Sequence, residues 1–392
     1  MEVSPKQRFL DIAHFKRPGD LSLLSSLNYA NEATFVEWAK QGAPEQILDA
    51  GYRQSYFQFT PVRTLAGIRS AGMADTKLGP GITVRGGYPP LVPGFEPRII
   101  EEDERTVTYT NRGGQTARII RSSRFQRFQM PMYLDFPVKD RASWQEIKKH
   151  LEPETPERWP ADWGAYVQEM NSRDEPLSLS VGSFFGYLRE WVGVEGLLYM
   201  FYDDPALVED MMDTVLHLET EIIKRTLPEI EVQYAVIWED MCYKTGPLIS
   251  PAMVKKYMVP RYKKITELLR SYGVDVIYLD SDGNVEQLVP LWLECGINFI
   301  WPFEVAAGND VVAARKKYGR DLIIGGGIDK RALARDERAI RNEVMSKVPL
   351  LLEQGGYFPS LDHVIPPDVS LENYCHFINL MREVAGLTPL SF

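Results

Sequence analysis

The sequence contains little of what disulfide-rich, membrane-spanning or nucleic-acid-binding proteins need. It has three cysteines, Cys242, Cys295 and Cys375, and no CxxC pair, so neither a disulfide framework nor a thiolate metal site is expected. No apolar run approaches the roughly 18 residues of a membrane span. The net charge of -10 is not accompanied by a basic run, which argues against a nucleic-acid partner.

We expect no secretory signal. The segment Met1 to Lys6 lacks the basic start, apolar stretch and small-residue cleavage site of such a signal, so we expect a cytoplasmic protein. The 44% hydrophobic and 25% charged residues are typical of a globular protein. We treat residues 1–392 as one domain, because α/β barrels are longer than most single domains.

Short β-branched runs alternate with longer amphipathic segments over about residues 177–392. This alternation is typical of βα units in a parallel sheet. The expected strands are 177–181, 235–238, 274–279, 298–301, 322–324 and 356–358, and the expected helices include 6–15, 205–225, 251–271 and 336–353. The pattern predicts an α/β fold, and specifically a (β/α)8 TIM barrel.

The region from about residue 79 to 136 has a different pattern. It contains the glycine pairs Gly86-Gly87 and Gly113-Gly114 and an alternating Thr-rich run at 105–110. Such residues favour β-hairpins. We therefore expect an N-terminal antiparallel β elaboration beside the barrel.

Polar side chains directly follow five of the expected strands. They are Glu239, Asp240, Asp280, Asp282, Glu304, Asp329, Asp362 and His363. Because a barrel brings its strand ends to one face, we expect acids from these junctions to converge with His363. Such a group could bind a divalent cation or hold a proton for general acid catalysis.

Structural roles compete with these functional ones. Asp329 also fits the N-cap of the next helix, and Asp280 and Asp282 could satisfy loop amides. Glu239 and Asp240 are neighbours, so at most one of them enters the barrel interior if the strand continues. The Gly325-Gly326-Gly327 run lacks the spacing of a phosphate loop and indicates a close backbone approach. The aromatic residues near the junctions could line a pocket or belong to the core.

Six short motifs occur in the order found in the uroporphyrinogen decarboxylase superfamily, which the chain resembles from about Gly182 onward. They are GSFFG at 182–186, ED at 239–240 followed by LISP at 248–251, DSDGN at 280–284, PFE at 302–304, GGID at 326–329, and GGY at 355–357 leading to His363. The resemblance implies a (β/α)8 barrel, an active-site cleft at the C-terminal strand ends and, commonly, a homodimer.

Two branches of this superfamily differ in the residues they would place here. The decarboxylases bind a polycarboxylate with an arginine-rich N-terminal segment, where this chain has LSSLNYAN at 24–31. The thiol-methylating branch holds zinc with a His-x-Cys pair and a later Cys, which by order fall on Asp280, Asp282 and His363. Replacing soft ligands with carboxylates favours a harder ion or a substrate that reacts through oxygen.

The resemblance therefore implies an O-demethylating methyltransferase that passes a methyl group from a methoxylated, aromatic compound to a corrinoid cobalt. The cobalt would be carried by a partner protein, since no Asp-x-His-x-x-Gly cobalamin motif occurs. The expected catalytic residues are His363, Glu239, Asp282 and Glu304, the substrate-binding residues are Phe184, Phe185, Asp240, Tyr243 and Trp301, and the ligands of zinc or another divalent cation are Asp280, Asp282 and His363. A thiol or amine methyltransferase, a decarboxylase or lyase of a small non-porphyrin acid, and a non-catalytic binding protein remain alternatives.

Overall fold

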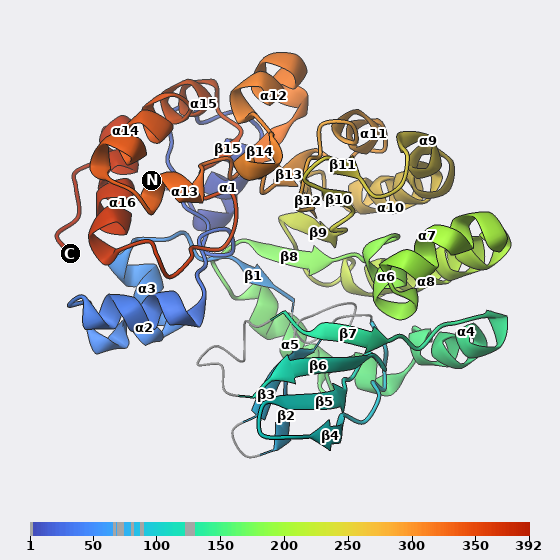
Figure 1. Ribbon diagram of the computed structural model, residues 1–392. Helices are drawn as coiled ribbons and strands as arrows, with labels where there is room; N and C mark the ends of the chain where they lie inside the picture. Colours follow the sequence, from blue (N-terminus) through green and yellow to red (C-terminus); the bar gives the residue numbers. More distant parts are fainter. Residues whose placement is uncertain (1–2, 66–67, 69–73, 80–81, 87–89, 122–129) are drawn as a thin grey trace.

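A seven-stranded parallel sheet forms the centre of the molecule (Figure 1). The computed structural model describes residues 3–65, 68, 74–79, 82–86, 90–121 and 130–392. In sheet order the strands are β1 (Arg63–Thr64), β8 (Leu177–Ser180), β9 (Tyr234–Trp238), β12 (Ile277–Asp280), β13 (Phe299–Trp301), β14 (Ile323–Gly325) and β15 (Tyr357–Phe358). Six of these are the strands expected from the sequence, within a few residues at each end.

The two edges of this sheet are joined by the N-terminal segment around residues 24–30. Leu24 forms a parallel bridge with Thr60, just before β1, and Ala30 forms one with Ile365, beyond β15. The backbone N–H of Thr60 donates to Leu23 O at 2.8 Å, and that of Ile365 donates to Tyr29 O at 3.1 Å. In the described chain, isolated bridges thus take the place of an eighth strand, and the fold is TIM-barrel-like.

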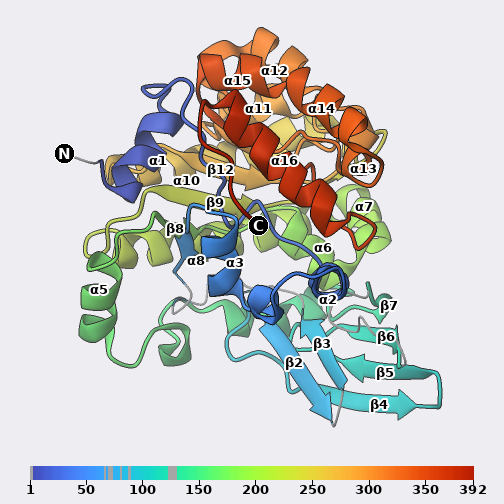
Figure 2. The same ribbon diagram turned by 90° about the vertical axis from the view of Figure 1, so that its left-hand side faces the viewer.

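Helices cover the outside of the sheet, and α16 packs against α13, α14 and α15 (Figure 2). These outer helices are α6 (Gly186–Val192), α7 (Val194–Asp203), α8 (Pro205–Thr226), α9 (Pro251–Met253), α10 (Val259–Ser271), α11 (Val289–Glu294), α12 (Val311–Tyr318), α13 (Lys330–Leu333), α14 (Glu337–Met345), α15 (Val348–Gln354) and α16 (Leu371–Val384). Over the described residues, every helix is too short or too polar to cross a bilayer.

Two of the expected long helices are interrupted. The segment 251–271 contains a π-helical turn at Val254–Met258 between α9 and α10, and 336–353 divides into α14 and α15. Pro260 and Pro349 lie at the starts of α10 and α15. Proline has no N–H to donate to the preceding turn, so a continuous α-helix is disfavoured at both places.

Alternate strand residues point to opposite sides of the barrel wall. Tyr234, Tyr278, Phe299 and Trp301 belong to an interior cluster that also contains Phe9 of α1 (Pro5–Ala13). The residues between them, such as Ile237, Leu279 and Ile300, pack with the outer helices in the larger core cluster. The Phe9 ring lies 4.9 Å from that of Tyr234, so α1 covers the end of the barrel where the strands begin.

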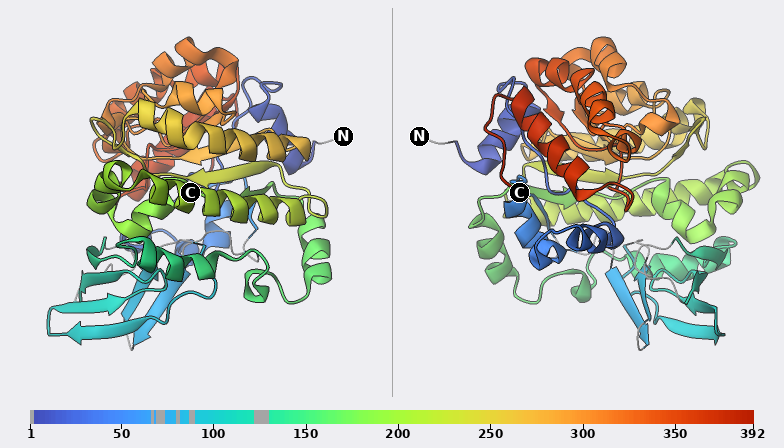
Figure 3. Two further views of the ribbon diagram at one scale, coloured as in Figure 1. Left: turned by 90° about the vertical axis from the view of Figure 1, so that its right-hand side faces the viewer. Right: turned by 60° about the vertical axis from the view of Figure 1, so that its left-hand side comes forward.

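An antiparallel part projects from the barrel (Figure 3). It consists of the hairpin β2 (Ala74–Gly79) and β3 (Ile82–Gly86) and the sheet β4 (Arg98–Glu102), β5 (Thr106–Thr110), β6 (Thr116–Ile120) and β7 (Met132–Asp135). Val107, Tyr109, Ala117 and Ile119 form its small core. The expected elaboration is confirmed in these residues and begins before residue 79, whereas Gly87 lies outside the described residues.

Further helices of the N-terminal half follow less periodic sequence and were not among the expected elements. They are α2 (Glu32–Lys40), α3 (Ala50–Tyr56), α4 (Arg141–Lys148) and α5 (Trp163–Asn171). Short 3-10 turns occur at Glu45–Leu48, Lys149–Leu151, Pro156–Arg158, Val305–Ala307 and Gly319–Asp321. Side-chain caps from Asn31, Asp49, Asp140 and Asp162 begin the four α-helices.

Candidate functional site

Acidic side chains and one histidine meet where the barrel strands end. Asp282, Glu304 and His363 each place a potential ligand atom within 4.8 Å of the others, and Asp240, Asp280 and Asp282 form a second such group. Asp282 belongs to both groups. The structure therefore brings together Asp282 and His363, as the sequence predicts, but pairs Asp280 with Asp240 and Asp282 rather than directly with His363.

His363 is held in a fixed orientation. Its Nε2 lies 3.2 Å from Asp282 Oδ2. Its ring stacks on Trp301, with centroids 6.3 Å apart and planes 22° apart. Burial lowers the pKa of His363, but the hydrogen bond and charge of Asp282 outweigh burial and hold the pKa above its usual value. His363 is therefore suited to carrying a proton next to Asp282.

Burial and neighbouring carboxylates make Asp240 and Asp280 less acidic. Burial, followed by the charge of Asp282, raises the pKa of Asp240 to about 6, against the opposing charge of Arg189. Burial and the charges of Asp240 and Asp282 raise the pKa of Asp280 well above its usual range. Like charges at this distance cannot all be ionised without a large cost, so the group keeps a proton near neutral pH.

Arg189 in α6 is the main site residue that the sequence does not reveal. Its Nη1 donates to the backbone O of Asp240 at 2.6 Å, and its Nη2 lies 3.7 Å from Asp240 Oδ2. The guanidinium also lies 5.0 Å from the centre of the Trp238 ring. Because Arg189 belongs to a helix and is 51 positions from Asp240, no local motif indicates this contact.

Glu239 and Asp240 follow directly after the end of β9, and their side chains point to different places. Glu239 has the parity of Ala235 and Ile237, which pack towards the outer helices, and its side chain is completely buried. Its Oε2 accepts from Ser183 Oγ at 2.9 Å, Phe185 N at 2.8 Å and Gly186 N at 3.0 Å, and its Oε1 accepts from Phe184 N at 2.8 Å.

Burial raises the pKa of Glu239 to about 7, while these four donors lower it. Asp240 follows with a positive φ of 45°, a conformation that costs a non-glycine residue energy. This turn accompanies the change of direction from Glu239 to Asp240. The Asp240 side chain lies with those of Asp280 and Asp282. Glu239, which was expected to be catalytic, thus accepts from the Ser183 hydroxyl and the backbone amides of residues 184–186.

The four aromatic residues expected to bind substrate lie in different environments. Phe184 and Phe185 are 2% and 0% exposed, and the Phe184 ring packs 4.6 Å from that of Tyr262. Their rings belong to the core, and the expected substrate contact does not fit this placement. Trp301 is buried against His363. Tyr243, in the hairpin β10 (Cys242–Tyr243) and β11 (Gly246–Pro247), is 61% exposed.

Several acids also link neighbouring loops through backbone amides. Glu304 Oε2 accepts from Gly283 N at 2.8 Å, and Asp240 Oδ1 accepts from Asp282 N at 3.2 Å. Asp362 accepts from Val305 N at 2.9 Å and from Lys330 N at 3.0 Å. These bonds hold the loops after β9, β12, β13, β14 and β15 in fixed relation. Some acidic side chains at the strand ends therefore have a structural role, since they hold the loops together.

Two structural predictions from the sequence are confirmed near the site. Asp329 caps α13, its side chain accepting from Arg331 N. The Gly325-Gly326-Gly327 run makes close backbone contacts, since a Cβ at Gly326 would lie 2.4 Å from Pro302 O. The run is a packing feature that lets the loops after β13 and β14 touch.

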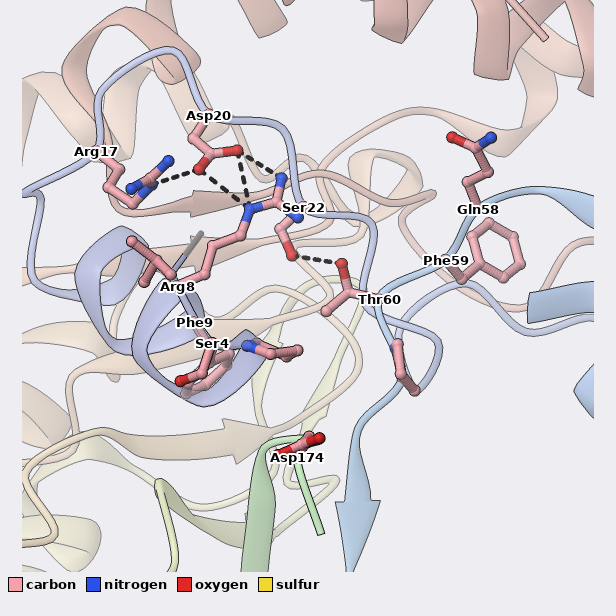
Figure 4. Close-up of a pocket in the computed structure, with 13 residues that line it drawn as sticks. Ser4, Arg8, Phe9, Arg17, Asp20, Ser22, Gln58, Phe59, Thr60 and Asp174 are labelled. Carbon is pink, nitrogen blue, oxygen red and sulfur yellow. Dashed lines mark hydrogen bonds and ion pairs between the residues drawn. The ribbon is translucent and has the colours of Figure 1, made fainter. Parts of the chain in front are cut away.

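A hollow of about 810 Å³ lies at the opposite end of the barrel, beside α1 (Figure 4). Arg8 and Arg17 both bond to Asp20 there, and Ser22 Oγ donates to Thr60 Oγ1 at 3.0 Å. None of the residues that line this hollow belongs to either group of acids at the strand ends. Because the reactive groups of barrel enzymes collect at the C-terminal strand ends, we place the functional site at the acids.

Asp282, Glu304 and His363 form a donor set suited to a divalent cation. Two carboxylates and one imidazole match the ligands of catalytic zinc sites and of harder divalent ions. They come from three different loops, and their potential ligand atoms are all within 4.8 Å of each other.

Comparisons with known proteins agree with this architecture. A family model described as uroporphyrinogen decarboxylase (URO-D) matches residues 169–384. The uroporphyrinogen decarboxylase of Sulfurovum sp. is 26% identical over 48% of this chain and 51% of its own length. That of Carboxydothermus hydrogenoformans is 25% identical over 36% of this chain and 39% of its own length. The matches thus span about half or less of these curated relatives.

A solved structure of a methyltransferase from Methanosarcina mazei has the same fold. It superimposes with a TM-score of 0.57 over 97% of this chain and 99% of its own, at 14% sequence identity. At this identity the likeness concerns the fold.

Proposed function

Because the chain belongs to the uroporphyrinogen decarboxylase (URO-D) family, whose model matches more than half of it, we propose that it is a methyltransferase of that superfamily. Its methyl donor is a methoxylated aromatic compound, and the acceptor is the cobalt of a corrinoid carried by a partner protein. The proposal rests on one observation, the convergence of Asp240, Asp280, Asp282, Glu304 and His363 at the C-terminal strand ends. These groups supply what cleavage of an aryl methyl ether requires.

The leaving group of this reaction is a phenoxide, which departs more easily when its oxygen is protonated. In the proposed step, the electron pair of cobalt(I) forms the bond to the methyl carbon while the carbon–oxygen bond breaks. The electrons of that bond stay on the oxygen, which takes a proton from the aspartate group. Asp280 is the best candidate to hold that proton, because burial and its two acidic neighbours raise its pKa.

A divalent cation would be held by Asp282, Glu304 and His363. When bound, it would supply positive charge to the leaving oxygen. Asp282 would then link the two groups, because it contacts His363 and also lies beside Asp240 and Asp280. Asp280, which the sequence suggested as a ligand, is left to hold the proton.

Decarboxylation of uroporphyrinogen is not supported by the residues of this chain. The segment 24–31, where decarboxylases of the superfamily carry arginines, contains none, and its backbone helps to close the barrel. A substrate with many carboxylates would meet an acidic site without compensating charge. The low identity to the curated decarboxylases points the same way.

The proposal is tested by incubating the protein with aryl methyl ethers and cob(I)alamin, and by following methylcobalamin formation together with release of the phenol. We expect both products in equal amounts and neither with an Asp282→Asn variant. Release of carbon dioxide from an aromatic or small carboxylic acid in the absence of cob(I)alamin would instead establish a decarboxylase. Conversion of uroporphyrinogen would show that the charge argument is wrong.

A further inference from the structure

We propose that Glu239 is a positioning residue: its buried carboxylate fixes the loop at 182–186 and, through α6 and Arg189, the place of Asp240. It does not exchange a proton with the substrate. The inference concerns the same site and rests on the proposed function only where turnover is measured.

The first step of the argument is the contact between Glu239 and the loop after β8. Its two oxygens accept four hydrogen bonds of 2.8–3.0 Å, from three consecutive backbone amides and the Ser183 hydroxyl. All four groups are donors, so the carboxyl group acts here as an acceptor. A group whose oxygens are occupied in this way and whose side chain is completely buried has little means of reaching a substrate.

The second step is that α6 depends on this contact for its start. The N-cap of α6 is Phe185, which has no side-chain hydrogen bond to offer the first turn. The amides of Phe185 and Gly186 would be left without a partner in a buried place, a state that costs about 1–3 kcal/mol for each group. Glu239 supplies the missing acceptor from a different strand. The loop also needs Gly186, because a Cβ there would lie 2.6 Å from Ser183 Oγ and 3.0 Å from Glu239 O.

The third step connects α6 to the acidic group. Arg189, in the last turn of the short helix α6, donates to Asp240 O at 2.6 Å and lies 3.7 Å from its carboxylate. Asp240 Oδ1 in turn accepts from Asp282 N, and Asp282 contacts His363. A shift of α6 would therefore move the Arg189 guanidinium relative to Asp240, and with it disturb the aspartate group.

Glu219 in α8 provides a matched control on the same loop. It is also completely buried, and its Cγ would lie 2.8 Å from a Cβ built at Gly182. Among the described residues, however, neither of its carboxyl oxygens has a hydrogen-bond partner. The two glutamates thus share burial and the adjacent loop but differ in hydrogen bonding.

The experiment compares Glu239→Gln with Glu219→Gln. Glutamine keeps the size of the side chain but directs an NH2 group at backbone N–H donors when it replaces Glu239. We expect Glu239→Gln to increase deuterium uptake of a peptide covering 183–192 and to reduce turnover by at least about tenfold. The pH–turnover profile of Glu239→Gln should keep both its acidic and its basic limb. Glu219→Gln should change neither uptake nor turnover.

Two results would overturn the proposal. Loss of turnover in Glu239→Gln with unchanged uptake, or loss of one limb of its pH profile, would assign Glu239 a direct proton transfer. Unchanged uptake and turnover would show that the contact has no effect. If Glu239→Gln does not fold, Ser183→Ala removes one of the four donors and should change uptake in the same direction; no change would also contradict the proposal. Failure of the proposed methyl transfer would leave the uptake comparison intact.

Discussion

At the scale of single residues, His363 is the side chain whose removal should most directly affect chemistry. It contacts Asp282 and Trp301 and belongs to the potential cation site. We expect His363→Ala to lower kcat by at least about tenfold with an unchanged thermal unfolding curve, because a positioned acid, base or ligand is lost. His217→Ala, at an exposed position of α8, is the control. A His363→Ala enzyme with wild-type turnover would remove His363 from the site.

Glu219 should make stability depend on pH. Burial raises the pKa of its carboxyl well above the usual value of 4.5, so the folded state keeps a proton that the unfolded state releases. The stability is therefore fully present below pH 4.5 and falls as pH rises towards the raised pKa. Glutamine cannot ionise, so Glu219→Gln should lose this slope and gain in melting temperature relative to wild type from pH 5 to pH 8. Parallel curves for the two proteins would contradict this expectation.

At the scale of elements, the contact between the loops after β13 and β14 should depend on a single glycine. Gly326 has a φ of +80°, and a Cβ there would lie 2.4 Å from Pro302 O, whereas Gly273 has a φ of +86° with nothing within 4 Å. Alanine at Gly273 adds backbone strain of about 1–3 kcal/mol. Alanine at Gly326 adds the same strain and a clash with backbone. Denaturant unfolding should therefore show a larger loss of stability for Gly326→Ala, and equal losses would argue against the close approach.

At the scale of the whole molecule, the loops of the barrel together create the potential cation site. We expect protein purified without chelator to contain a divalent cation, as measured by mass spectrometry of the metal content. Asp282→Ala should lower that content, because Asp282 belongs to both acidic groups, while Glu267→Ala on the exposed surface of α10 should not. An active protein without metal would assign Asp282, Glu304 and His363 to substrate contact instead.

The parallel strands and most outer helices follow from the sequence, because burial imposes a local period on the chain. Strands such as Tyr234–Trp238 and Phe299–Trp301 read as short apolar runs, and Asp204-Pro205 marks the start of α8. The interruptions before Pro260 and Pro349 were not expected, although both prolines are visible. Closure of the barrel by the segment around 24–30 has no local signature, since it depends on two isolated bridges to distant residues.

The order of residues along the chain shows which polar side chains follow the strands, and hence that Asp240, Asp280, Asp282, Glu304 and His363 could meet at one end of a barrel. How these side chains are placed and bonded depends on the folded chain. It turned Glu239 outward to the backbone of the 183–186 loop, brought Arg189 to Asp240, and placed the rings of Phe184 and Phe185 in the core. The physical reason is that the hydrogen bonds of Glu239 and Arg189 join residues 54 and 51 positions apart, whereas local patterns record only neighbours along the chain.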